Sequence, residues 1–263
     1  MLEITDIRKT FFPGTVNERI ALDSVSLTLH DGDFVTVIGS NGAGKSTLLN
    51  AVSGKLAVDS GDIRIDERSV RRMKDYARAR YIGRVFQDPM AGTAPELTIE
   101  QNLALALTRG TTRGLGIGVS KRRRVLFREE LVKLELGLED RLKARVGLLS
   151  GGQRQALSLL MASFTQPDIL LLDEHTAALD PQRAQHVTEL TKSIVGEFGL
   201  TTLMVTHNMA QALQLGNRLI MMHEGRIILE LDEAQKRDAS VEDLLEEFRK
   251  IKGAVVDDRT MLG

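Results

Sequence analysis

The sequence predicts an α/β fold in which a helical lobe is inserted into a core of alternating strands and helices. Short β-rich and helical segments alternate at both ends of the 263-residue chain, whereas Asp88–Leu148 has helical spacing without a strong strand pattern. The bare apolar segment Ile169–Leu172 is typical of a parallel strand covered on both faces. We therefore expect a core formed by residues 1–87 and 165–240, a helical lobe at 88–164, and a C-terminal helix and tail at 241–263.

The composition narrows the class of protein. Apolar residues make up 42% and charged residues 27%, which is ordinary for a globular chain. With 35 Lys+Arg against 36 Asp+Glu, the chain is not one that binds nucleic acid or membranes through bulk positive charge. The lack of Cys excludes disulfide scaffolds, zinc–thiolate sites and thiol catalysis. No apolar run approaches the ~20 residues of a membrane span, so a role at a membrane would need another chain to supply the spanning helices.

The first third of the chain is expected to form several strands and two helices. Ile20–Leu29 alternates between polar and apolar residues, and the β-rich run Phe34–Ile38 ends in a glycine loop. Lys45–Val52 has a helical pattern that Gly54 stops, and Val70–Arg80 predicts a charged helix. Further strands are expected at Leu2–Arg8, Asp62–Ile65 and Tyr81–Phe86.

Helical spacing dominates the middle, and the α/β pattern then returns. Leu97–Leu107 and Arg124–Leu136 predict helices separated by a Gly-, Thr- and Arg-rich loop at Thr108–Val119. Beyond them we expect helices at Gln153–Phe164, Pro181–Glu197, Met209–Leu215 and Val241–Ile251, strands at Ile169–Leu172 and Thr201–Val205, and a hairpin formed by Arg218–Met222 and Arg226–Leu231.

A glycine-rich loop after the strand Phe34–Ile38 has the pattern G-x-x-x-x-G-K-[ST] and opens a helix, which is the context this phosphate-binding motif requires. Its glycines let backbone amides turn toward anionic oxygens, and the helix N-terminus adds a partial positive charge. Lys45 is expected to reach the β- and γ-phosphates, and the Ser46 hydroxyl to ligate Mg²⁺. The alternative is a glycine turn with a chance lysine. The predicted phosphate-binding residues are Gly39, Ser40, Asn41, Gly42, Ala43, Gly44, Lys45, Ser46 and Thr47.

The apolar strand Ile169–Leu172 delivers two carboxylates to its C-terminal end, where open α/β sheets bind ligands. Asp173 would hold Mg²⁺ directly or through water, and Glu174 would polarise an attacking water. An apolar strand that ends in Asp-Glu is common by itself. Together with the phosphate loop, it predicts a nucleoside triphosphatase.

A second anion site is predicted at Leu149–Gln155, where Ser150 is a good N-cap and two glycines leave the amides of the next helix bare. This stretch resembles the signature motif of the ATP-binding cassette (ABC) family, and other motifs follow in that family's order from Met1 to about Phe248. The resemblance implies a P-loop NTPase (RecA-like) core with an antiparallel β subdomain and an inserted α-helical subdomain. It also implies the cofactors ATP and Mg²⁺.

The resemblance assigns roles to individual positions. Gln87 resembles the Q-loop glutamine, which contacts the metal and the γ-phosphate, and His207 resembles the switch histidine, which positions water with Glu174. Phe11 resembles the aromatic that stacks on adenine, with Phe12 as the competing position. The resemblance places a second group of residues against the nucleotide, namely Ser150, Gly151, Gly152, Gln153 and the D-loop residue Asp180.

Members of this family pair head to tail, with each ATP between one subunit's phosphate loop and the other's signature motif. Two phosphate-binding helix ends of one chain cannot easily grip one γ-phosphate, whereas two chains related by a twofold axis can. The resemblance thus implies an ATP-dependent homodimer on the cytoplasmic face of the inner membrane. It would drive transmembrane permease subunits, with a solute-binding protein as an indirect partner, and would have no nucleic-acid partner.

The sequence departs from the family at two positions, because His175 stands where Pro is more common and Ala177 where Ser is more common. Glu174 is intact, so we expect hydrolysis to be retained. His175 either tunes the pH response or is simply tolerated. A histidine here resembles a subgroup of bacterial uptake ATPases, some linked to aromatic amino acids.

Two other features leave alternatives open. The basic cluster Lys121–Arg124, with Arg113 and Arg128, is either a solvated helix face or a contact for anionic lipid or a partner loop. A soluble ABC ATPase acting on nucleic acid or ribosomes is the competing function, but such proteins carry coiled-coil inserts, zinc modules or two cassettes. A P-loop kinase or GTPase would leave the Ser150–Gln155 motif and His207 without a role.

Overall fold

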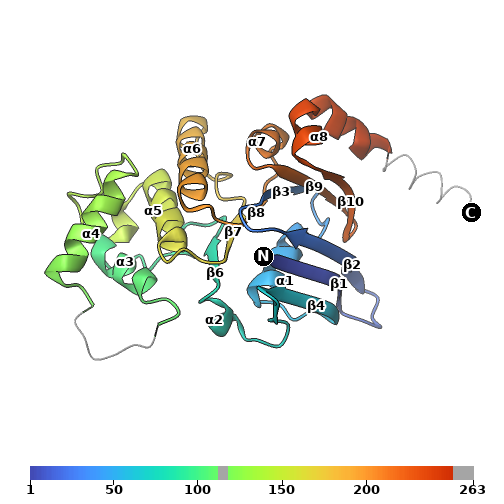
Figure 1. The fold of residues 1–263 in the computed structure, drawn as a ribbon, viewed down its shortest axis with the longest axis horizontal. Helices are drawn as coiled ribbons and strands as arrows, with labels where there is room; N and C mark the ends of the chain where they lie inside the picture. The colour runs from blue at the N-terminus through green and yellow to red at the C-terminus, as the bar shows by residue number, and fades with distance from the viewer. Residues whose placement is uncertain (112–117, 251–263) are drawn as a thin grey trace, which may run out of the picture.

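The computed structural model describes residues 1–111 and 118–250, which form two β-sheets flanked by helices (Figure 1). The larger sheet has six strands in the order β10-β9-β3-β8-β7-β6. Five of them run parallel, and β10 pairs antiparallel with β9 at one edge. The strands are β3 (Phe34–Gly39), β6 (Ile82–Val85), β7 (Ile169–Asp173), β8 (Thr202–Val205), β9 (Arg218–His223) and β10 (Arg226–Leu231).

The smaller sheet is antiparallel, in the order β2-β1-β4-β5. Its strands are β1 (Leu2–Phe11), β2 (Arg19–Leu29), β4 (Ser60–Ile65) and β5 (Arg68–Ser69). One apolar cluster joins its inward-facing side chains to helix α1 (Lys45–Ser53) and to one face of the larger sheet, with Leu2, Ile63, Leu48 and Val37 among its fully buried members. This cluster fixes α1, the helix that follows the phosphate loop, between the two sheets.

On the opposite face of the larger sheet lie α5 (Gly151–Ser163) and α6 (Pro181–Phe198), while α3 (Ile99–Leu107) packs against α5 and α4 (Lys121–Val132) packs against α3 (Figure 1). Their cluster includes Phe127 and Leu157 together with the strand residues Val85, Leu170 and Met204. The helices therefore share one core with the sheet rather than forming a separate one. The exact boundaries of the expected lobe, 88 and 164, stay a prediction.

The C-terminal part packs at the β9 side of the larger sheet. It comprises α7 (Met209–Gln214), α8 (Glu233–Asp238) and a helical segment at 241–250. Ala212 and Leu244 are buried against Ile38, Leu219 and Met221. In the described ranges no helix combines the length and apolar character that crossing a membrane would require.

One predicted helix is wrong. Val70–Arg80 forms only the short helix α2 (Asp75–Arg78). Val70 is fully buried and its amide donates to Ile63 O at 2.8 Å, so the start of this segment extends the β ladder instead. The Arg78 guanidinium is buried and donates to the carbonyl oxygens of Ala51, Val52, Met73 and Arg71. Tertiary contacts thus override the local helical pattern.

Other expectations need smaller corrections. The helix expected at Arg124–Leu136 is α4, which begins three residues earlier because the Ser120 side chain caps it by accepting from the Arg123 amide. The helix α8 has no counterpart among the predictions. Arg113, much of the predicted loop Thr108–Val119 and the tail from residue 251 lie outside the described residues.

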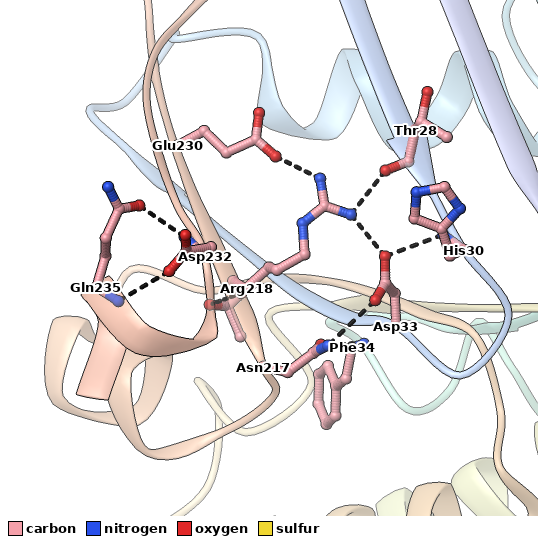
Figure 2. A network of polar contacts seen from close by, with 10 residues as sticks. Thr28, His30, Asp33, Phe34, Asn217, Arg218, Glu230, Asp232 and Gln235 are labelled. Atoms are coloured by element: carbon pink, nitrogen blue, oxygen red, sulfur yellow. Dashed lines mark hydrogen bonds and ion pairs between the residues drawn. The ribbon is translucent and has the colours of Figure 1, made fainter.

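The amino ends of the parallel strands are joined by a polar network centred on Arg218 (Figure 2). Its guanidinium donates to Asp33 at 2.5 Å and to Thr28 O at 2.8 Å, and it pairs with Glu230. Asp33 also accepts from the His30 amide at 2.9 Å and from Asn217 Nδ2 at 3.1 Å. Burial alone would raise the pKa of Asp33, but the hydrogen bonds from Asn217, His30 and Arg218 hold that pKa below its usual value.

Candidate nucleotide site

The predicted catalytic segments follow the carboxyl ends of four adjacent strands of the larger sheet. The phosphate loop follows β3, His207 follows β8, Glu174 follows β7, and Gln87 follows β6. These strands are parallel, so their carboxyl ends meet at the same edge, where open α/β sheets bind ligands. The order of the strands therefore brings together segments that are up to 168 positions apart in sequence (207 minus 39).

The phosphate loop is held in place by hydrogen bonds to its backbone carbonyl oxygens. Lys45 Nζ donates to Gly39 O at 2.7 Å and to Ser40 O at 3.0 Å. Arg19 donates to Gly42 O at 2.8 Å, and the Gly225 amide donates to Ala43 O at 3.0 Å. With these carbonyls occupied, the amides of the loop and of the first turn of α1 are the groups suited to bind phosphate oxygens.

Gly44 shows why this loop needs glycine. It is the N-cap of α1 with φ of 101°, a conformation that L side chains rarely adopt. A Cβ there would lie 2.4 Å from Ala21 O. Any larger residue would push the loop away from β2 and displace the amides that follow.

A cleft of about 970 Å³ opens beside the loop. Residues 40–43 form one wall, and side chains of β2 and the β9–β10 hairpin, including Arg19, His223 and Arg226, form the other. Phe11 is not among the lining residues. It is half-buried at the end of β1 with the Lys9 ammonium 5.9 Å from its ring, while Phe12 is 66% exposed. The adenine-stacking role of Phe11 stays a prediction.

Lys45 is 6% exposed and lies in the field of two acidic side chains. Burial lowers the pKa of Lys45 below its usual value, while the carboxylates of Glu174 and Asp173 oppose this shift. A cation held in this way is poised to receive a polyphosphate. Its present hydrogen-bond partners are neutral carbonyls, which a phosphate oxygen can replace with a charged partner.

Glu174 and His207 face one another across the ends of β7 and β8. Glu174 Oε2 lies 3.5 Å from His207 Nδ1, and the Glu174 amide donates to Val205 O at 2.9 Å. Glu174 has φ of 43°, an uncommon conformation for a residue with a side chain. The chain therefore turns sharply after Asp173. As a result the Asp173 carboxylate contacts Arg84, whereas the Glu174 carboxylate lies beside His207. Backbone strain of this kind is often found at functional sites.

Asp173 is bound to an arginine that the motif analysis did not single out. Arg84 Nη2 donates to Asp173 Oδ2 at 2.8 Å, and both side chains are largely buried. In the described residues Asp173 Oδ1 has no hydrogen-bond partner. Ser46 is exposed on the first turn of α1. One hydroxyl and one carboxylate oxygen fit Mg²⁺, which is commonly bound by one or two protein oxygens together with substrate phosphates and water.

Gln87 and the signature stretch complete the inventory. Gln87 is exposed just beyond β6. Ser150 caps α5 in a capping box with Gln153, whose amide donates to Ser150 Oγ at 3.3 Å while the Ser150 amide donates to Gln153 Oε1 at 3.2 Å. Ser150, Gly152 and Gln153 line a separate pocket of about 380 Å³ that shares no residue with the phosphate-loop cleft. One chain thus carries two separate helix N-termini that the sequence predicts to bind anions.

Asp180 lies near the signature helix. It is exposed and caps α6 by accepting from the Arg183 amide at 3.2 Å. Arg183 lines the signature pocket, and its side chain would lie 3.1 Å from a Cβ placed on Gly152. A larger residue at 152 would therefore require the Arg183 side chain of α6 to shift by a few tenths of an ångström.

Two buried glutamines near the site were given no role by the motif analysis, although Gln155 ends the signature stretch Leu149–Gln155. Gln211 of α7 accepts from Thr206 Oγ1 at 2.8 Å and donates to Thr176 and Thr188 at 3.1 and 3.0 Å. It thereby ties the segment before His207 to the segment after Glu174 and to α6. Gln155 of α5 donates to Phe86 O at 3.3 Å, next to Gln87. Apart from the bond between Thr206 and Gln211, these contacts join residues 23 to 69 positions apart, so no local pattern could have indicated them.

His175 is buried and neutral. It is 2% exposed, and burial lowers its pKa to about 4. Its Nε2 lies 2.9 Å from Thr191 Oγ1, which donates its own hydrogen to Val187 O at 2.7 Å, so His175 must be the donor. A neutral imidazole that bonds to α6 agrees with the alternative in which His175 is tolerated rather than titrating at physiological pH.

Comparison with known proteins gives a consistent result. The family profile described as ABC transporter matches residues 22–177. A tyrosine transport ATP-binding protein of Clostridioides difficile (strain R20291) is 45% identical over 254 residues, which cover 94% of this chain and 98% of that protein. The methionine import ATP-binding protein MetN of Rhizobium johnstonii is 36% identical over 233 residues, but this chain spans only 60% of its length.

Solved structures agree. A post-hydrolysis dimer of the ATP-binding cassette MJ0796, bound to ADP and phosphate, superposes with a TM-score of 0.75 at 30% identity over 89% of this chain and 99% of that one. The ADP conformation of the cassette MJ1267 gives 0.77 at 26% identity over 94% and 98%. The fold is the P-loop NTPase fold of these cassettes. The chain therefore belongs to the ABC transporter family and is an ATPase.

Proposed function

We propose that this chain is the ATP-hydrolysing subunit of an uptake transporter for an amino acid, with an aromatic amino acid as the favoured substrate. The observation that carries the proposal is the meeting of the phosphate loop, Glu174 and His207 at one edge of the sheet. The substrate class is supported by the 45% identical relative, which is named for tyrosine transport and matches over nearly its whole length.

The proposed chemistry divides among residues that the sheet brings together. Amides of the loop 39–47 and Lys45 bind the phosphates, while Ser46, Asp173 and Gln87 are assigned to Mg²⁺. Glu174 accepts a proton from the attacking water, and His207, 3.5 Å from it, contacts the γ-phosphate and helps to orient that water. Phe11 is assigned to the adenine.

The second anion site requires a second copy of the chain. The signature pocket around Ser150 and the phosphate-loop cleft have no residue in common. We infer that two copies sandwich two ATP molecules, with Ser150, Gly151, Gly152, Gln153 and Asp180 of one chain completing the other chain's site. ATP then favours the closed dimer, and hydrolysis removes that preference.

Opening and closing of the dimer would drive transmembrane permease subunits bound at the cytoplasmic face of the inner membrane. A groove of about 520 Å³ lies beside the Q-loop strand, with the exposed Tyr76 and Leu105 on its rim. Exposed apolar side chains around a concavity are typical of a contact for another protein. A solute-binding protein would act only through those permease subunits.

The ATP sandwich is tested by Glu174→Gln. Loss of the carboxylate should abolish turnover but retain bound ATP, so the variant should elute from a sizing column as a dimer with MgATP and as a monomer without it. Lys45→Ala is the matched control, because loss of the phosphate contact should weaken ATP binding itself and leave a monomer under both conditions. A Glu174→Gln monomer in saturating MgATP would contradict the proposal.

The transport role needs a separate test. The tagged chain, extracted with mild detergent from its host, should co-purify with a multi-span membrane protein. Deleting its gene should then reduce uptake of radiolabelled tyrosine, and re-expression of the wild type but not of Glu174→Gln should restore it. Uptake that is unaffected for aromatic amino acids would refute the proposed substrate class.

A further inference from the structure

We propose that Arg84 is a positioning residue for the metal site. It binds one carboxylate oxygen of Asp173 and thereby fixes the Asp173 carboxylate relative to α1, the helix that follows the phosphate loop. This inference rests on the proposed assignment of Asp173 to Mg²⁺. It assigns a role to a side chain outside all the motifs discussed above.

The guanidinium of Arg84 is held on several sides. Nη2 donates to Asp173 Oδ2 at 2.8 Å, while Nη1 donates to Asn50 Oδ1 at 2.8 Å and to Ser53 Oγ at 3.0 Å. The Phe86 ring packs against its face, with the guanidinium carbon 4.8 Å from the ring centroid. The Arg84 and Asp173 side chains are only 11% and 14% exposed, so the pair is not a solvated surface contact.

The partners of Arg84 come from the elements that carry the two metal donors. Asn50 and Ser53 belong to α1, the helix that presents Ser46. Asp173 ends β7. A metal bound by Ser46 and Asp173 would bridge α1 and β7, and Arg84, projecting from β6, already bridges the same two elements. It therefore sets the separation of the two donors before any metal arrives.

A competing role would be that Arg84 neutralises Asp173 and must leave when Mg²⁺ binds. The geometry is against this role. Leaving would break the contacts with Asn50 and Ser53 on α1 and with Phe86, which follows β6, as well as the ion pair with Asp173 at the end of β7. Only Oδ2 is used by Arg84, so Oδ1 can turn to a metal or its water while the arginine stays. Partners of a metal-binding carboxylate commonly orient it in this way.

The linkage between metal and nucleotide provides the test. The affinity for a fluorescent, non-hydrolysable ATP analogue is measured in saturating Mg²⁺ and in EDTA, and the ratio of the two affinities reports the metal's contribution. We expect Arg84→Met to lower this ratio about tenfold, as loss of such an orienting partner commonly does. Arg84→Lys should lower it as well, because an ammonium keeps the charge but lacks the planar fork that spans Asp173 and α1.

The matched control is Asn50→Ala, which removes one of the two hydrogen bonds between Arg84 and α1 and leaves the ion pair with Asp173 intact. If Arg84 positions Asp173, we expect the ratio to fall about threefold, which corresponds to the net free energy of about one hydrogen bond. If Arg84 only neutralised the charge of Asp173, then Asn50→Ala would leave the ratio unchanged and Arg84→Met would raise it. Either result would overturn the inference. Should Arg84→Met fail to fold, Asn50→Ala and Arg84→Lys decide alone.

Asp173→Asn separates this inference from the proposed function. If Asp173→Asn leaves the ratio unchanged, then Asp173 does not serve the metal and the assignment itself fails. If Asp173→Asn lowers the ratio but Arg84→Met does not, only the role of Arg84 fails. Because the EDTA affinity is measured on the same sample, it shows that each variant retains its nucleotide cleft.

Discussion

The two ends of the parallel strands each contain an Arg–Asp pair, and the pairs differ in how completely the aspartate is satisfied. At the amino ends, Asp33 has three kinds of donor: Arg218, Asn217 and the His30 amide. At the carboxyl ends, Arg84 is the one hydrogen-bond donor to the Asp173 carboxylate within the described residues. The exposures of the two carboxylates are similar, at 12% and 14%.

This difference separates a structural end of the sheet from a functional one. A buried carboxylate normally has its hydrogen-bonding capacity filled, because unpaired polar groups are costly. Asp33 satisfies this rule and gains a lowered pKa. Asp173 has one carboxylate oxygen without a hydrogen-bond partner among the described residues. The adjacent Glu174 has a strained backbone and a side chain that is 22% exposed. The fold tolerates incomplete satisfaction at the edge where a ligand can complete it.

The largest expected effect is at the amino ends. Arg218→Met would leave Asp33 and Glu230 without their cation, so we expect the free energy of unfolding to fall by about 3–5 kcal/mol in urea titrations. The nucleotide affinity of the folded protein should not change. Arg237→Met is the control, since Arg237 and Glu233 form an exposed helical pair that should contribute little. Weakened ATP binding in Arg218→Met would break the division between the two ends.

At the carboxyl ends of the strands, the buried His175 should make the free energy of unfolding depend on pH. Its pKa is about 4 in the folded protein and near 6.5 when unfolded, so between these values the unfolded chain binds more protons. Its contribution to stability is complete above pH 6.5 and is lost as the pH falls toward 4, by about 3 kcal/mol. Comparing unfolding free energies over this range for wild type and His175→Gln isolates the histidine from the titrating carboxylates.

The control for this pH experiment is His207→Gln, which removes a 60% exposed histidine and leaves the buried imidazole of His175 in place, so the slope that His175 causes should remain. If His175→Gln keeps the full pH dependence of the wild type, then the imidazole is not the neutral, buried group described here. Such a result would restore the other alternative, in which His175 tunes the site.

The sequence predicted the functional end of the sheet better than the structural end. The phosphate loop, Asp173–Glu174 and the Ser150 cap are local patterns whose spacing follows from the chemistry of phosphate, metal and helix termini. Arg84–Asp173 and Arg218–Asp33 join positions 89 and 185 residues apart, and no pattern within one segment encodes such a pair. The prediction of a helix at Val70–Arg80 was wrong for the same reason. Arg78 donates to carbonyl oxygens of α1, and the Val70 amide donates to Ile63 O of β4.

The smallest expected effect compares two glutamines, one at each end of the sheet. Gln211→Leu removes three hydrogen bonds that link Thr206, Thr176 and Thr188, so it should lower the free energy of unfolding by about 2 kcal/mol. Gln235 closes only the cap of α8 with Asp232 (Figure 2), so Gln235→Leu should cost about 1 kcal/mol or less.

The two glutamine variants should differ most in turnover. Thr206 precedes His207, and Thr176 lies two residues beyond Glu174, so loss of Gln211 frees both partners of the Glu174–His207 contact. We expect Gln211→Leu to reduce kcat for ATP hydrolysis several-fold with little change in KM, and Gln235→Leu to change neither. Equal kcat values in the two variants would mean that polar contacts at the carboxyl ends serve stability alone, as those at the amino ends do. A reduced kcat in Gln211→Leu only would show that the network behind the site also keeps its catalytic groups in register.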